Sequence, residues 1–135
     1  MNDMQKQQLV RRAVAARSGA YAPYSGFRVG AAVLDECGKI YTGCNIENIS
    51  YPATICAERA AVAVAVSAGA KHIMAVAVCA GETPVTPCGV CRQVLCEFAL
   101  PDASVLCANG DGTKVEQYTL GELLPHAFAE FEKDR

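Results

Sequence analysis

The sequence lacks an excess of basic residues and any long apolar segment. Its 12 lysines and arginines are outnumbered by 14 aspartates and glutamates, which gives a formal net charge of −2. This balance makes the chain a poor candidate for binding long phosphate backbones, so we expect no nucleic-acid partner. No run of residues is long and apolar enough to cross a bilayer, so we expect no membrane partner either.

Residues 1–17 are polar and charged where a signal peptide would be apolar, so we expect no signal peptide. We therefore expect a cytoplasmic protein, in which most of the eight cysteines are reduced. Cysteines in that setting are better explained as metal ligands and buried thiols than as a disulfide framework. The 52% hydrophobic content predicts a folded chain. Without repeats or linkers, residues 1–135 are predicted to form a single domain.

The hydrophobic pattern predicts four helices and five strands. The expected helices cover residues 3–18, 55–68, 89–98 and, as a short turn, 121–124. The expected strands cover residues 29–34, 39–43, 73–79, 104–108 and 114–118. The helix at 55–68 is apolar nearly all round, so we expect it to be buried on most faces. The order of the elements predicts an α/β fold, a three-layer α/β/α sandwich around a mixed sheet of about five strands, with at least one parallel pair.

Two short cysteine motifs suggest a metal site. Cys88 and Cys91 form a C-x₂-C pair, whose spacing lets two thiolates bind one ion, and Cys56 could supply a third. Both motifs fall at predicted loop-to-helix junctions, where the partial positive charge of a helix N-terminus favours thiolates. Three protein ligands leave one tetrahedral position open, which is the arrangement of a catalytic Zn²⁺ ion, one per chain.

Glu58 and Arg59 directly follow the first of these ligands along the chain. Glu58, two residues after Cys56 at a helix start, is the candidate catalytic acid and base. Three thiolates on Zn²⁺ leave a net charge of −1, which weakens its Lewis acidity. We propose that Arg59 donates hydrogen bonds to ligand sulfur and offsets this charge.

Two other interpretations of the cysteines stay open at this point. The C-x₂-C pair alone is also typical of a redox-active dithiol, although such a site would use neither Cys56 nor Glu58. A structural zinc site would need a fourth ligand, for which Cys79 and Cys96 are the candidates.

The motifs together resemble the zinc deaminase family, whose signature is a ligand, one residue, Glu, and a later Pro-Cys-x-x-Cys. Cys56-x-Glu58 and Pro87-Cys88-x-x-Cys91 match it with cysteine as the first ligand. The resemblance extends over residues 20–128 and is to the short, three-cysteine, homotetrameric cytidine deaminases. The further segments that carry it are residues 23–32 (PYSGFRVGAA), 45–48 (NIEN), 56–59 (CAER), 87–93 (PCGVCRQ) and 123–128 (LLPHAF). Ala60 and Val90 depart from the residues most common in the family, where Thr and Ala are frequent.

The resemblance implies roles that the spacing alone does not give. Asn45 and Glu47 would bind the 3′-hydroxyl of the ribose, although a polar pair in a loop is by itself more typical of a turn cap. Phe27 would pack against the base, and Ala57 would offer backbone groups to the pyrimidine. Two further substrate-binding positions, Tyr51 and Phe128, would be lent across subunit interfaces, so the resemblance implies a homotetramer with shared active sites.

The implied reaction is the hydrolysis of cytidine and deoxycytidine to uridine and deoxyuridine plus ammonia, in pyrimidine salvage. Zinc-bound hydroxide would attack C4 while Glu58 shuttles protons. An aminonucleoside deaminase of the blasticidin type shares the metal signature, and the segment at 45–48 favours ordinary nucleosides instead. A polynucleotide deaminase shares the chemistry but needs a basic surface, which this chain lacks.

Overall fold

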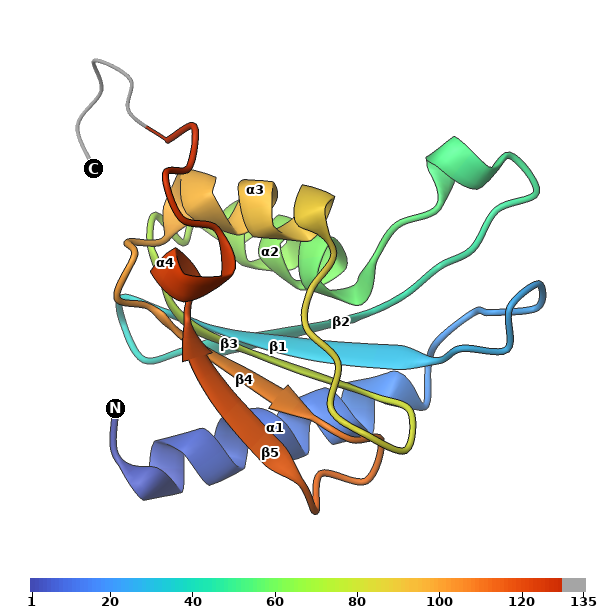
Figure 1. The fold of residues 1–135 in the computed structure, drawn as a ribbon, viewed down its shortest axis with the longest axis horizontal. Helices are drawn as coiled ribbons and strands as arrows, with labels where there is room; N and C mark the ends of the chain where they lie inside the picture. Colours follow the sequence, from blue (N-terminus) through green and yellow to red (C-terminus); the bar gives the residue numbers. More distant parts are fainter. Residues whose placement is uncertain (130–135) are drawn as a thin grey trace.

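A five-stranded mixed sheet lies between helix α1 on one face and helices α2 and α3 on the other (Figure 1). The computed structural model describes residues 1–129. Its helices are α1 (Asp3–Arg17), the 3₁₀ turn η1 (Tyr51–Ala53), α2 (Ala57–Ser67), α3 (Gly89–Phe98) and α4 (Leu120–Leu123). Its strands are β1 (Val29–Asp35), β2 (Ile40–Cys44), β3 (Ile73–Ala80), β4 (Ser104–Ala108) and β5 (Val115–Thr119). The predicted α/β fold with three layers and five strands is confirmed.

The strands lie in the order β2-β1-β3-β4-β5. The β3–β4 pair is parallel and the other three pairs are antiparallel. A parallel pair requires a crossover, and α3 supplies it. The carboxyl end of β3 therefore leads directly into the loop that precedes α3, and this loop carries Pro87 and Cys88.

The alternation of side chains along the central strands builds two separate cores. Val76 and Val78 of β3 belong to the core beneath α2 and α3. Ala75, Ala77 and Cys79 of the same strand belong to the core beneath α1. The expectation that this apolar run is a strand covered on both faces is therefore confirmed.

Helix α1 begins with a capping box, which its sequence encodes. The Asn2 side chain accepts a hydrogen bond from Gln5 N, and the Gln5 side chain accepts one from Asn2 N. These bonds satisfy two backbone donors that a helix start leaves unpaired. Leu9, Val10 and Ala13 form its buried face against the sheet. None of the helices within residues 1–129 is long and apolar enough to cross a membrane.

Helix α2 differs from the sequence-based expectation that it is buried on most faces. Its buried residues are Ala57, Glu58, Ala61, Val62 and Ala65. Its other face is open in the single chain, where Val64 is 48% exposed and Val66 is 37% exposed. The prediction is therefore wrong for the isolated chain, because the strands β1, β2 and β3 and helix α3, which contact α2, leave Val64 and Val66 uncovered within residues 1–129.

The segment between β2 and α2 contains η1, which the sequence pattern does not predict. In Figure 1 this green segment extends beyond the sheet and returns to the start of α2. Ile46 pairs with both Tyr21 and Ile55 through isolated bridges. These bridges anchor the base of the segment beside Cys56.

Candidate metal centre

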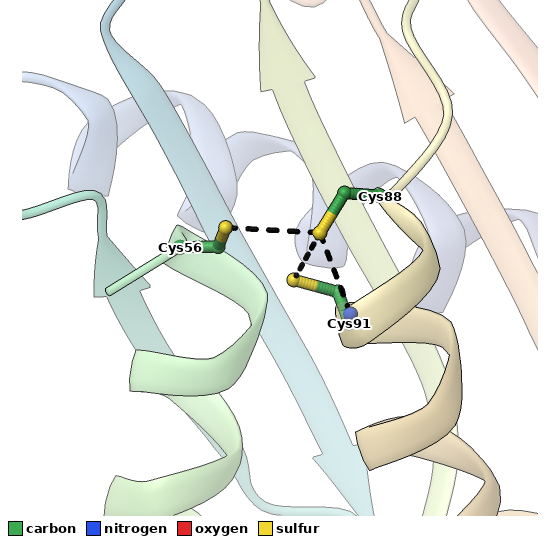
Figure 2. A group of neighbouring side chains, drawn as sticks. All are labelled: Cys56, Cys88 and Cys91. Carbon is green, nitrogen blue, oxygen red and sulfur yellow. Dashed lines mark hydrogen bonds between the residues drawn. The ribbon is translucent and has the colours of Figure 1, made fainter. Parts of the chain in front are cut away.

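The N-termini of α2 and α3 carry the three cysteines of the predicted metal site. Cys56 is the N-cap of α2 and Cys88 is the N-cap of α3, each with an extended backbone. Cys91 lies in the first turn of α3, where its backbone N–H donates to Cys88 Sγ. Cys88 Sγ caps its own helix by accepting this bond, whereas the Cys56 side chain makes no capping bond to α2 and its sulfur lies near Cys88 Sγ instead. Figure 2 shows the three side chains converging from the two helices.

The distances between the sulfurs fit a single zinc ion. Cys56 Sγ lies 3.8 Å from Cys88 Sγ, and Cys88 Sγ lies 3.3 Å from Cys91 Sγ. All three sulfurs lie within 4.8 Å of one another. Ligands at the usual Zn–S distance of about 2.3 Å stand roughly 3.8 Å apart around a tetrahedral ion. The donor set and its spacing therefore fit zinc, held by Cys56, Cys88 and Cys91.

The thiols of this cluster shift one another's pKa values in opposite directions. A hydrogen bond from Cys91, with further bonds from Cys88 and Arg59, lowers the pKa of Cys56 to about 5. The same bond to Cys56, together with burial, raises the pKa of Cys91 far above its usual range. Neighbouring sulfurs therefore share one negative charge readily, and a second thiolate needs a positive charge between them.

Arg59 lies where it can offset the charge of these thiolates. Burial acts to lower its pKa, but hydrogen bonding and attraction to Cys56 outweigh burial and raise it. Nη2 donates to Thr54 O at 2.9 Å, which fixes the guanidinium. Nε is buried and has no hydrogen-bond partner within residues 1–129, so a buried donor remains for ligand sulfur.

Glu58 is a buried carboxyl next to the sulfur cluster, with only 4% of its surface exposed. Burial raises the pKa of Glu58 to about 7, and the charge of Cys56 acts in the same direction. A carboxyl that titrates near neutral pH can accept and return a proton with little cost in free energy. The geometry therefore suits a proton carrier beside a metal.

The alternative of a structural zinc site with four protein ligands loses support. Cys79 and Cys96 are both buried, and neither belongs to the cluster. In the part of the chain that the structure describes, Cys56, Cys88 and Cys91 are the full metal-ligating group. The open fourth position is the pattern of a catalytic ion. The presence of Cys56 in the group also disfavours a simple redox pair.

Ala57 and Phe27 are the two residues expected to contact the base. Ala57 is fully buried between Cys56 and Glu58 along the chain. Phe27 lies just before β1 with 45% of its surface exposed, and its ring reaches the end of β3, since a Cβ on Gly81 would lie 3.4 Å from Phe27 Cε1. The loop that continues from Gly81 ends at Cys88, so Phe27 and the sulfur cluster lie at the ends of one short loop.

Asn45 and Glu47 make hydrogen bonds within their own chain, as the side chains of turn caps do. Asn45 bonds to the backbone of Phe27 and Val29, and Glu47 accepts three hydrogen bonds from the segment at residues 24–25. An amide offers two donors and two lone pairs, and a carboxylate offers about four lone pairs. Each side chain therefore keeps capacity for at least one further partner, such as a sugar hydroxyl.

Tyr51 and Phe128 are strongly exposed in the single chain, at 83% and 71%. Tyr51 belongs to η1 on the extended segment, and Phe128 follows α4. Neither residue packs into the core of its own chain. Exposed aromatic residues of this kind are typical of interfaces.

Arg92 is a residue that the sequence analysis did not assign. Its guanidinium donates to Pro87 O at 2.7 Å, Leu123 O at 2.7 Å and Thr86 Oγ1 at 2.9 Å. Arg92 therefore fastens the loop before Cys88 to the C-terminal end of α4. The sequence motif shows an arginine next to Cys91. Its bond to Leu123, 31 residues further along the chain, depends on the fold and does not follow from the motif.

Comparisons with known proteins agree with this geometry. The model of the cytidine and deoxycytidylate deaminase zinc-binding region matches residues 3–107. The chain is 48% identical to a cytidine deaminase of Halalkalibacterium halodurans over 93% of this chain and 95% of that protein. A cytidine deaminase of Sporosarcina psychrophila is 49% identical over 93% of each chain. The solved structure of cytidine deaminase from Burkholderia pseudomallei superposes with a TM-score of 0.86 at 44% identity, over 95% of this chain and all of that one.

Proposed function

The chain belongs to the cytidine and deoxycytidylate deaminase family, and we propose that Cys56, Cys88 and Cys91 hold its zinc ion while Glu58 moves the protons. The enzyme catalyses the zinc-dependent hydrolytic deamination of cytidine, which breaks a C–N bond and gives uridine and ammonia. We extend this activity to deoxycytidine. The observation that carries the site is a buried carboxyl beside three sulfurs that lie within 4.8 Å of one another.

The protein groups divide the work of this reaction. Zinc, when bound, supplies the Lewis acidity that makes water nucleophilic near neutral pH. Glu58 accepts a proton from the attacking water and passes it to N3 of the ring as the new C4–O bond forms. It then carries the second proton to the amine, which leaves as ammonia. A single carboxyl suffices, because both transfers occur on the same face of the ring.

The remaining residues bind and orient the nucleoside. Phe27 packs against the base, and backbone groups of Ala57 face the pyrimidine. Asn45 and Glu47 bind the 3′-hydroxyl with the hydrogen-bonding capacity that their contacts to the chain leave free. Arg59 offsets the charge of the ligand sulfurs, supported by its buried Nε, which no residue from 1 to 129 pairs with.

Replacing Glu58 with glutamine tests the proton carrier. Glu58→Gln should bind one zinc per chain and lose at least about 100-fold in kcat, because the amide cannot carry a proton. Glu116→Gln is the matched control, since Glu116 is exposed on β5, outside the proposed site, and should keep normal turnover. Turnover is followed by the loss of cytidine absorbance. Glu58→Gln with near-normal kcat would overturn the assignment.

We further propose that the enzyme is a homotetramer whose active sites are shared. The support is a set of large apolar side chains that the single chain leaves exposed. These side chains come from the segment around η1, the outer face of α2, the start of α3 and the segment after α4. They are Ile49, Tyr51, Val64, Val66, Val90 and Phe128. Large apolar side chains that stay exposed on several elements favour a subunit interface. Analytical ultracentrifugation should give a single species of four chains.

A mixing experiment tests whether Phe128 serves a neighbouring subunit. Glu58→Gln lacks the proton carrier but keeps Phe128. Phe128→Ala keeps the proton carrier but lacks the aromatic ring. Co-expressed as mixed oligomers, the two variants should regain activity above the sum of their separate activities, because some sites combine an intact Glu58 with a neighbour's Phe128. Activity equal to the sum would show that Phe128 acts only within its own chain.

We also propose that the enzyme works in the cytoplasm. No disulfide joins any of the eight cysteines, which all lie within residues 1–129 and include the proposed zinc ligands, and reducing conditions preserve such thiols. Treatment with a thiol oxidant should release zinc and abolish activity, and a thiol reductant with added zinc should restore both. Full activity in oxidising conditions would contradict this expectation.

A further inference from the structure

The segment that carries Phe27 has no regular secondary structure, yet side chains from elsewhere hold it at several points. It comprises residues 22–28 and connects the bridge residue Tyr21 to β1. Asn45 Oδ1 accepts from Val29 N at 2.9 Å, and Asn45 Nδ2 donates to Phe27 O at 2.8 Å. The buried Asn45 therefore fixes the carbonyl of Phe27 and the start of the strand that follows it.

Glu47 holds the other end of the same segment. Its Oε1 accepts from Tyr24 N at 2.9 Å and from Ser25 N at 3.1 Å, and its Oε2 accepts the hydroxyl proton of Ser25. These bonds lower the pKa of Glu47, the Ser25 hydroxyl being the main cause. A charged acceptor makes such hydrogen bonds stronger than neutral ones.

Ser25 links this carboxylate to Phe27. The hydroxyl gives its single proton to Glu47 and accepts the backbone N–H of Phe27 at 2.9 Å. One donor and one acceptor are thus both used, and polarisation by the carboxylate strengthens the second bond. The amide of Phe27 is held by Ser25 and its carbonyl by Asn45, so the backbone of this residue is fixed on both sides.

We propose that Ser25 is a positioning residue, which transmits the hold of Glu47 to Phe27 and so orients the aromatic ring against the cytosine base. This inference rests on the proposed contact between Phe27 and the base. Ser25 itself touches no substrate. Part of the effect of Glu47 on cytidine binding then passes through Ser25 and the ring of Phe27, in addition to any direct bond to the sugar.

Replacing Ser25 with alanine removes the link and leaves the rest of the segment in place. Ser25→Ala should raise KM for cytidine roughly fivefold, with kcat within about twofold, because the ring contact is made equally in the ground state and the transition state. Ser25→Thr keeps the hydroxyl and should stay within about twofold of the wild-type KM. Ser18→Ala is the matched control, because that exposed serine also makes a local hydrogen bond, to Ala15 O at 2.8 Å, and should leave KM unchanged.

A double-mutant cycle separates positioning from a general loosening of the loop. Phe27→Ala should raise KM, and adding Ser25→Ala to it should raise KM no further, since the two residues act through one contact. Multiplying effects in the double variant would overturn the inference. A wild-type KM in Ser25→Ala beside a raised KM in Phe27→Ala would also overturn it, while the proposed role of Phe27 would stand.

Amide hydrogen exchange tests the positioning itself, without substrate. The Phe27 amide should exchange at least about fivefold faster in Ser25→Ala than in wild type, and at the wild-type rate in Ser25→Thr and Ser18→Ala. Unchanged exchange in Ser25→Ala would refute the link whatever the kinetics show. If the Phe27 amide exchanges faster in Ser25→Ala but Phe27→Ala keeps a wild-type KM, the proposed contact between Phe27 and the base is refuted instead.

Discussion

Replacing Gly43 with alanine should force β2 and α2 apart at the point where the helix carries the metal site. A Cβ on Gly43 would lie 2.5 Å from Ala61 N and 2.8 Å from Ala57 O, both of which are backbone atoms. Ordinary contacts of a Cβ begin near 3.4 Å, so the strand and the helix would have to separate by up to about 0.9 Å. Ala57 lies between Cys56 and Glu58, and the displacement therefore reaches the proposed ligand and proton carrier.

The expected cost follows from the close packing of this region. Overpacking of a core costs about 1–3 kcal/mol, and backbone atoms on both sides place Gly43→Ala near the upper end. A loss of this size should lower the thermal midpoint by roughly 10 °C. Zinc should also be lost faster to a chelator, since the spacing between Cys56 and the other two sulfurs changes.

Thermal unfolding at fixed protein and zinc concentrations measures this effect, because bound metal and assembly both shift the midpoint. Gly19→Ala is the control. Its added Cβ would lie 3.6 Å from Ala16 O and 3.7 Å from Cys44 Sγ, which are ordinary contacts. Its midpoint should stay within about 2 °C of wild type. A Gly43→Ala variant that melts like wild type and keeps its zinc would refute the claim that this contact sets the position of α2.

Three further predictions concern the groups around the sulfurs. Arg59→Gln should raise the pKa of Cys56 and lower kcat roughly tenfold, measured by titration of thiolate absorbance in the metal-free protein and by turnover of the zinc-loaded one. Arg92→Ala should speed zinc loss to a chelator about 10- to 100-fold by freeing the loop before Cys88, whereas Arg11→Ala on the exposed face of α1 should not. The metal's contribution to stability should be full at alkaline pH and fall as the pH drops, because protons compete with zinc for the ligand thiolates, and metal analysis after dialysis at stepwise lower pH should show progressive loss of zinc.

The helices, the strands and the position of the ligands follow from local sequence. The apolar run at residues 73–79 had to be a strand covered on both sides, because its length and composition leave no polar face. Cys56 and Cys88 precede helical stretches directly, so the sequence places them at helix starts, and the structure has both as N-caps. The C-x₂-C spacing then brings Cys91 onto the first turn beside Cys88.

The contacts between loops do not follow from local sequence. Ser25 and Glu47 are 22 residues apart, and their meeting depends on the bridge between Tyr21 and Ile46. The exposed side of α2 was also mispredicted, because an apolar helix surface has the same sequence pattern whether its own chain or another chain covers it. Both features are set by the arrangement of elements in space.

Zinc titration of the metal-free enzyme tests the central claim most directly. Protein stripped by a chelator is given increasing zinc, and the conversion of cytidine to uridine is followed by absorbance at each addition. Activity should rise from near zero in proportion to the zinc added and reach its plateau at one zinc per chain. Full activity without zinc, or a plateau at a different ratio of zinc to chain, would contradict a single catalytic ion held by Cys56, Cys88 and Cys91.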